Sequence, residues 1–227
     1  NEETRHYLWE AYAAEPEMRL NLGIRRRLWP LLQGGRRQIE LLHGLILSLH
    51  GCAVMYYGDE IGMGDNVKLG DRRGVRTPMQ WSTGPNAGFS AAPADKLFAP
   101  IITDAEYHYA GRNVESQERS PTSFLNWYRR MVKTHSVNPI FGGGRMRLLE
   151  PDNTRVFAFT RELEEGFILC IFNLSRFVQP AGIDLSPWRG RTPVELMGRA
   201  RFPAVGDAPY TFSLGPHSFL WFNLEPR

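Results

Sequence analysis

The chain has 227 residues, of which 42% are hydrophobic, 12% aromatic and 22% charged, and its formal net charge is +3. These values are typical of an ordinary globular protein of one or two domains, with enough chain for a sizeable core. The basic residues are spread along the chain, which argues against nucleic acid as a partner, and no apolar run approaches the length of a membrane span.

The ends and the cysteines indicate where the protein works. The N-terminus lacks the basic segment and short apolar run of a secretory signal, so we expect a cytoplasmic protein. The chain begins at Asn1 without a methionine, which we interpret as the start of a piece cut from something longer. Cys52 and Cys170 lie in separate apolar runs, and we expect two buried free thiols rather than a disulfide.

Apolar periodicity predicts three helices in the first fifty residues, over Glu2–Ala14, Met18–Leu32 and Arg36–Ser48. The basic cluster Arg25–Arg27 is expected on a solvated face of the second helix. Gly51 ends the third helix, because glycine in a helix interior costs conformational entropy.

A strand and a long loop follow. The apolar run Ala53–Tyr57 is too short for a helix and lies between glycines, which predicts a strand buried on both faces. It leads into Asp65–Ser90, a loop rich in glycine, arginine, aspartate and asparagine. Long ordered loops in compact domains usually carry function. Helix, turn, buried strand and loop together form the repeating unit of an α/β fold with a parallel sheet.

The second half of the chain has a different texture. A helix is predicted over Ser120–His135, and the glycines at 142–144 make a flexible joint. Short segments rich in β-branched and aromatic residues then alternate with turns, which predicts a small antiparallel β-sandwich. The predicted strands are Met146–Leu149, Val156–Arg161, Phe167–Asn173, Ala181–Leu185, Thr192–Leu196, Tyr210–Leu214 and Ser218–Leu224. We therefore predict two domains, residues 1–139 and residues 140–227.

The carboxylates near the strand end do not form a convincing catalytic pair. Asp59 and Glu60 are adjacent, and neighbouring residues that leave a strand point to opposite sides, so one site can hardly receive both. Asp65, Asn66 and Asp71 offer oxygen ligands, but their spacing does not match a calcium-binding loop. The six histidines show no metal-site spacing, so we expect neither a metal nor a cofactor.

Arg76 stands out within the loop. It precedes Thr77-Pro78, where proline fixes the backbone, and the apolar anchor Met79–Trp81 follows. A guanidinium braced in this way can form bidentate hydrogen bonds with vicinal sugar hydroxyls. The residues alone leave a second role open, in which the arginine only pins the loop.

Several motifs resemble the end of the catalytic barrel in the α-amylase superfamily, glycoside hydrolase family 13, in the branch of α-glucosidases and glucoside isomerases. These motifs are Tyr56–Met63, Val75–Trp81 and Asn86–Phe89. Four further motifs resemble the trehalose synthase (maltose α-D-glucosyltransferase) branch, and together the matches cover nearly the whole chain. They are Arg19–Leu28, Leu69–Arg72, Asn113–Glu115 and Asn173–Arg176.

The resemblance implies a fold and a set of site residues. It implies the C-terminal portion of a (β/α)8 TIM barrel, with helix 7, strand 8, loop 8 and helix 8, followed by an antiparallel β-sandwich domain. It implies that Arg76, together with Asp71 and Arg72, binds substrate, with Arg76 contacting the non-reducing glucose. The catalytic carboxylates of the family have no counterpart here, and we expect them upstream of residue 1.

The implied reaction is the isomerisation of maltose to trehalose by a retaining, intramolecular glucosyl transfer, which this chain alone is not expected to perform. Two alternatives stay open: an α-glucosidase or sucrose isomerase of the same superfamily, and a noncatalytic carbohydrate-binding or assembly module. The implied partners are maltose, trehalose and glucose, the missing N-terminal half of the barrel, and either a further copy in a homo-oligomer or a maltokinase.

Overall fold

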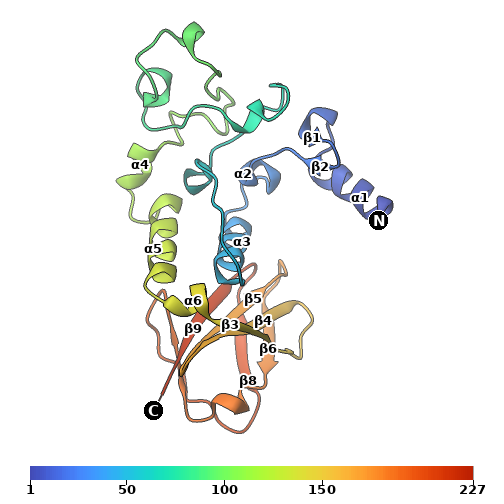
Figure 1. The fold of residues 1–227 in the computed structure, drawn as a ribbon, viewed down its shortest axis with the longest axis vertical. Helices are drawn as coiled ribbons and strands as arrows, with labels where there is room; N and C mark the ends of the chain where they lie inside the picture. The colour runs from blue at the N-terminus through green and yellow to red at the C-terminus, as the bar shows by residue number, and fades with distance from the viewer. Residues whose placement is uncertain (227) are drawn as a thin grey trace. The chain divides into compact units, whose positions relative to one another are not determined.

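The computed structural model describes residues 1–226, which divide into two compact units (Figure 1). The first unit contains residues 1–36 and 55–128, and the second contains residues 37–54 and those from 129 onward. Among residues 1–226, no helix is both long and apolar enough to cross a membrane. The domain boundary expected between residues 139 and 140 remains a prediction.

The first unit consists of short helices, a small hairpin and long connecting loops. Its regular elements are α1 (Glu2–Tyr12), β1 (Arg19–Leu20), β2 (Gly23–Ile24), α2 (Leu28–Leu31) and α4 (Val114–Glu118). Single 3-10 turns lie at Pro16–Met18, Asp59–Ile61, Arg73–Val75, Pro85–Gly88 and Ala94–Lys96. The first predicted helix is present as α1, and the Asn1 side chain caps it by accepting the Thr4 N–H at 2.7 Å.

The helix predicted over Met18–Leu32 is wrong. The chain instead forms the antiparallel hairpin β1–β2, whose turn holds Asn21 in the left-handed region at φ 54°. An α-helix cannot continue through a left-handed residue, so only Leu28–Leu31 becomes helical. The cluster Arg25–Arg27, expected on a solvated helix face, lies partly or fully buried.

The strand predicted over Ala53–Tyr57 is also wrong. The segment forms no ladder, and its side chains are largely exposed, with Val54 at 85% and Tyr56 and Tyr57 each at 40%. A strand requires a neighbour that accepts and donates ladder hydrogen bonds. Within residues 1–226, the sheets provide no such neighbour for this segment.

One of the two expected buried thiols is exposed. Cys52 lies on the surface, because it adjoins the irregular segment after α3 (Arg36–Ser48). Cys170 is buried and free as expected, and burial raises the pKa of its thiol well above the usual range.

The second unit combines helices with two antiparallel sheets (Figure 1). Helix α3 occupies the predicted range, and α5 (Phe124–Ser136) begins later than predicted because the Ser123 hydroxyl accepts the Asn126 N–H at 3.2 Å. A short helix, α6 (Pro139–Gly143), leads into the strands. These are β3 (Arg145–Leu148), β4 (Val156–Leu163), β5 (Gly166–Asn173), β6 (Gln179–Ile183), β7 (Thr192–Glu195), β8 (Tyr210–Leu214) and β9 (Phe219–Glu225).

The predicted antiparallel sandwich is confirmed. One sheet has the order β3-β4-β5-β9-β7, and β6 pairs with β8 in a second sheet. A single apolar core takes side chains from both sheets, as expected when two half-apolar sheets pack face to face. Its buried members include Ala158, Leu169, Ile171, Ala181, Ile183, Phe212, Leu214, Phe222 and Leu224.

A buried arginine joins three segments of the second unit. The Arg161 side chain, fully buried on β4, donates to the carbonyl of Gly144 at 2.7 and 3.2 Å. It also donates to the carbonyls of Ser48 and Leu49 at 2.8 and 2.9 Å, where α3 ends. Basic side chains favour helix C-termini because the last carbonyls lack helical partners.

Candidate functional site

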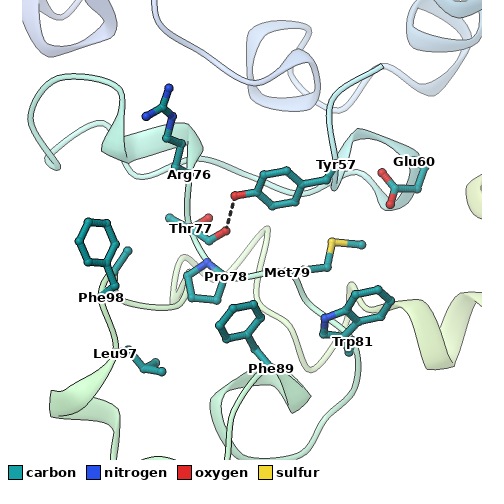
Figure 2. Close-up of a pocket in the computed structure, with 11 residues that line it drawn as sticks. Tyr57, Glu60, Arg76, Thr77, Pro78, Met79, Trp81, Phe89, Leu97 and Phe98 are labelled. Carbon is teal, nitrogen blue, oxygen red and sulfur yellow. Dashed lines mark hydrogen bonds between the residues drawn. The ribbon is translucent and has the colours of Figure 1, made fainter. Parts of the chain in front are cut away.

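A cavity of about 360 Å³ lies in the first unit, next to the end of the Ala53–Tyr57 segment (Figure 2). Most of the side chains that line it are apolar or aromatic, and the polar groups come from few residues, as in many ligand pockets. The lining residues are Tyr57, Glu60, Arg76, Thr77, Pro78, Met79, Trp81, Phe89, Leu97, Phe98 and Ala99.

Arg76 lines this cavity from the middle of the loop. It directly follows the 3-10 turn Arg73–Val75, and its backbone N–H donates to the Arg73 carbonyl at 3.0 Å. Thr77 and Pro78, which follow it, are buried, whereas the Arg76 side chain is exposed. Within residues 1–226 its guanidinium has no ion-pair or hydrogen-bond partner, so its donors are available to a ligand.

The other two predicted substrate-binding residues lie elsewhere on the loop. Asp71 and Arg72 are exposed, and neither belongs to the lining of the cavity. Asp71 adopts a left-handed conformation at φ 50°, and its backbone carbonyl accepts a hydrogen bond from Arg25. The structure thus brings Arg76 to the cavity without these two neighbours, and the binding role of all three residues stays a prediction.

Two arginines of the Arg25–Arg27 cluster hold the start of the loop. Arg25 donates to the carbonyl of Val67 at 2.8 Å and also to those of Leu69 and Asp71. Arg26 Nε lies 2.9 and 3.2 Å from the carboxylate oxygens of Asp65, whose side chain is only 4% exposed. A loop with few apolar residues therefore gains its order from guanidinium hydrogen bonds.

Asp65 makes one more contact within the protein. Its Oδ2 also accepts the backbone N–H of Arg27 at 2.7 Å, so both carboxylate oxygens serve the protein itself. Within the described part of the chain, no group of three or more His, Cys, Asp or Glu side chains could hold a metal ion.

Arg27 makes contacts near the cavity that sequence reasoning missed. Its side chain is 1% exposed, and it donates to the carbonyls of Tyr57 at 2.7 Å and Val75 at 2.8 Å. Its guanidinium lies 5.1 Å from the ring centre of Tyr56 and 5.0 Å from that of Tyr57, within cation–π range. In the sequence, the adjacent aromatic residues Tyr56 and Tyr57 were the one available signal that a buried arginine lies nearby.

Tyr57 makes the second contact with the Arg76 segment. Its hydroxyl donates to the Thr77 carbonyl at 2.8 Å (Figure 2). Burial, followed by the proximity of Tyr56, raises the pKa of Tyr57, so the phenol stays protonated and keeps donating near neutral pH.

Asp59 and Glu60 point to different surroundings, as expected for adjacent residues. Asp59 Oδ1 accepts from Arg27 Nη1 at 3.1 Å; burial raises the pKa of this carboxyl, and Arg27 opposes that rise. Glu60 lines the cavity. Burial, with smaller contributions from Glu60 and Asp59, raises the pKa of nearby Tyr128 to about 12.

The cavity can therefore bind a ligand but does not hold a pair of catalytic carboxylates. Among its described lining residues, Glu60 is the single acid. A retaining glycosidase needs two carboxyl groups about 5 Å apart, one as nucleophile and one as acid and base.

The aromatic walls provide a surface for a sugar ring. Trp81, Phe89 and Phe98 are 50%, 51% and 94% exposed, and all three line the cavity (Figure 2). A pyranose presents C–H bonds on its faces and hydroxyl groups at its edge, so it suits apolar walls with a few polar groups. The Oγ1 of Thr77, one of the lining residues, is buried and has no hydrogen-bond partner within residues 1–226.

Buried hydrogen bonds hold the segment Gln80–Trp81, which carries one of the aromatic side chains of the cavity. The fully buried Gln80 donates from Nε2 to the carbonyls of Tyr107 at 3.1 Å and Arg112 at 2.5 Å. The carbonyl of Trp81 accepts the Glu115 N–H at 3.0 Å. Buried backbone groups are costly when unpaired, so these bonds hold the segment in one position.

Comparison with known proteins identifies two family regions. Residues 27–144, just over half of the chain, match the family described as alpha amylase, catalytic domain. Residues 146–221 match the family described as maltogenic amylase, C-terminal domain. The cavity lies within the first match.

Two similar curated relatives carry related names. A trehalose synthase of Pimelobacter sp. (strain R48) is 51% identical over 98% of this chain and 40% of its own length. A trehalose synthase/amylase of Mycobacterium tuberculosis is 48% identical over 98% of this chain and 38% of its own length. The chain thus spans about 40% of the length of these relatives, and the expected resemblance is confirmed.

The solved structures agree on the fold. The trehalulose synthase from Pseudomonas mesoacidophila MX-45 superposes with a TM-score of 0.66 at 20% identity, covering 89% of this chain and 42% of that one. This likeness confirms the expected fold class, a portion of a catalytic barrel followed by a β domain. Because the catalytic-domain match covers more than half of its residues, the chain belongs to the α-amylase family.

Proposed function

We propose that this chain forms the closing part of the sugar pocket of a trehalose synthase, an enzyme that isomerises maltose to trehalose. The observation that carries the proposal is the identity of about one half, along nearly the whole chain, to proteins named trehalose synthase. The cavity supports it, because exposed aromatic side chains and Arg76 are among the residues that line it.

In this proposal Arg76 grips the non-reducing glucose of maltose. Its planar guanidinium suits two adjacent hydroxyl groups. Tyr57, Trp81 and Phe89 provide the apolar surface against which a sugar ring packs.

The reaction itself requires two carboxyl groups that we place on polypeptide outside residues 1–227. One carboxylate attacks C1 of the non-reducing glucose, while the other group protonates the glycosidic oxygen and glucose leaves. The released glucose turns within the closed pocket and its anomeric hydroxyl attacks the same C1. This attack breaks the bond between C1 and the first carboxylate, and the hydroxyl proton passes to the second group. The product is the α,α-1,1 linkage of trehalose, with retained configuration.

A fusion protein tests the proposal. In it, residues 1–227 replace the aligned segment of the Pimelobacter trehalose synthase, and products from maltose are separated by chromatography. We expect trehalose from the fusion, and neither trehalose nor glucose from the isolated chain. Replacing Arg76 by alanine should lower kcat/KM about 10- to 100-fold, the range for a hydrogen bond from a charged group. Turnover by the chain alone would refute the assignment of the carboxylates.

The same assay separates the alternatives. An α-glucosidase would release glucose without isomer, and a sucrose isomerase would prefer sucrose over maltose. A noncatalytic carbohydrate-binding module would bind maltose or trehalose at micromolar concentration as the isolated chain, which titration calorimetry measures directly.

A further inference from the structure

Arg76 lies between two peptide carbonyls that are both held in place. The carbonyl of Val75, immediately before it, accepts Arg27 Nη2 at 2.8 Å. The carbonyl of Thr77, immediately after it, accepts the Tyr57 hydroxyl at 2.8 Å. The backbone of Arg76 is therefore fixed on both sides, while its side chain is exposed at the cavity.

The two residues that supply these bonds are themselves joined. Arg27 Nη1 donates to the Tyr57 carbonyl at 2.7 Å, and the same guanidinium lies over the Tyr57 ring at 5.0 Å. One buried guanidinium thus connects Tyr57, before the loop, to Val75 within it, although the two residues are 18 positions apart in the sequence.

Fixing the backbone matters because of what an exposed arginine loses on binding. A long side chain loses rotamer entropy when a ligand orders it, and a mobile backbone would add further freedom that ligand binding must restrict. Holding both flanking carbonyls leaves only the side-chain torsions to be ordered. Such preorganisation improves affinity without adding any new contact to the ligand.

We infer that Arg27 and Tyr57 are positioning residues that hold Arg76 at the sugar cavity, an inference that rests on the proposed function of Arg76. The rest of the loop has its own supports, because Arg25 binds the carbonyls of Val67, Leu69 and Asp71 and Arg26 binds Asp65. Loss of the Tyr57 hydroxyl therefore loosens the Arg76 segment while the loop start stays in place.

Amide hydrogen exchange tests the positioning in the chain itself. In the variant Tyr57→Phe, peptides that span residues 75–78 should exchange about fivefold faster, because one hydrogen bond to that segment is lost. Tyr56→Phe is the matched control, since Tyr56 has the same exposed fraction and also lies beneath Arg27. In this control, the exchange rate of the same peptides should stay within about twofold of the rate in the parent chain. Equal exchange in the two variants would overturn the inference.

Kinetics in the fusion protein test the consequence for binding. Tyr57→Phe should raise KM for maltose about fivefold with a smaller change in kcat, and Tyr56→Phe should change neither by more than about twofold. In the Arg76→Ala background, Tyr57→Phe should have no further effect, because a positioning residue acts only through the residue it holds. Additive effects in the double variant would show that the Tyr57 hydroxyl acts on the sugar directly, and would overturn the inference.

The two tests separate the two proposals. A parent fusion that fails to convert maltose contradicts the proposed function, while hydrogen exchange in the chain still decides whether Tyr57 holds the Arg76 segment. A parent fusion that converts maltose, with Tyr57→Phe indistinguishable from Tyr56→Phe, leaves the proposed function standing and refutes the positioning role.

Discussion

Replacing Arg161 by methionine removes a buried guanidinium that supports three backbone carbonyls. These are the carbonyls of Ser48 and Leu49 at the end of α3 and that of Gly144 before β3. Methionine has a similar length and fills the space, so the substitution tests the hydrogen bonds more than the packing.

The magnitude follows from the groups left behind. A buried carbonyl without a hydrogen-bond partner costs about 1–3 kcal/mol, and the substitution removes a partner from all three carbonyls. Burial lowers the pKa of Arg161, which indicates that the folded protein also bears a desolvation cost for its charge, and removing the charge recovers part of the loss. We therefore expect Arg161→Met to lower the free energy of unfolding by about 3 kcal/mol.

Urea denaturation followed by far-UV circular dichroism measures this change. Arg155→Met is the matched control, because Arg155 is exposed just before β4, and it should change stability by less than about 0.5 kcal/mol. Arg161→Lys should fall between the two, since lysine keeps the charge but not the planar fork. If Arg161→Met were as stable as Arg155→Met, the guanidinium bonds would not stabilise the second unit and the reasoning would be refuted.

Three further predictions concern packing, pH and reactivity. Gly44→Ala should destabilise by about 1–2 kcal/mol in urea denaturation despite the better helix propensity of alanine, because its Cβ would lie 2.7 Å from a packed phenylalanine ring of β9. Gly142→Ala in α6, where a Cβ meets nothing within 4 Å, should be neutral or stabilising by up to about 1 kcal/mol; a loss equal to that of Gly44→Ala would contradict the packing argument. Burial lowers the pKa of His43 below 6.5, so as pH falls below that value the unfolded chain gains a proton that the folded chain refuses. Stability should therefore decrease from pH 7 to pH 5 in denaturation series, and His43→Asn should reduce the slope; two other histidines with lowered pKa keep part of it. A thiol reagent should label Cys52 at once and Cys170 only on unfolding, and rapid labelling of both in the folded chain would disprove the burial of the second thiol.

The sequence by itself determined the elements whose signals are local. Helix α3 and strand β8 occupy the ranges predicted for them, because apolar periodicity and the flanking turns lie within a few residues. The sandwich follows for the same reason, since each strand alternates with a turn that the sequence marks. The placement of Arg76 in an irregular loop was also predicted, because the composition of that loop is rich in glycine and polar residues.

Local sequence patterns could not predict the elements whose conformation depends on residues far along the chain. Met18–Leu32 shows helical spacing, yet Arg25 and Arg26 bind groups about 40 residues further along the chain, and those bonds favour an irregular path. Ala53–Tyr57 has the composition of a buried strand, but a strand exists only beside another one, which composition does not reveal.

The site shows the same division. The motif around Arg76 named the residue, while only the tertiary structure placed Tyr57 and Arg27 against its two flanking carbonyls. Hydrogen bonds across 20 and 48 residues leave no periodicity in the sequence, because they depend on where the chain returns in space rather than on which residues are neighbours. The sequence motif thus singled out Arg76, whose binding role stays a prediction, and the contacts of Arg27 and Tyr57 with its flanking carbonyls were decided by the fold.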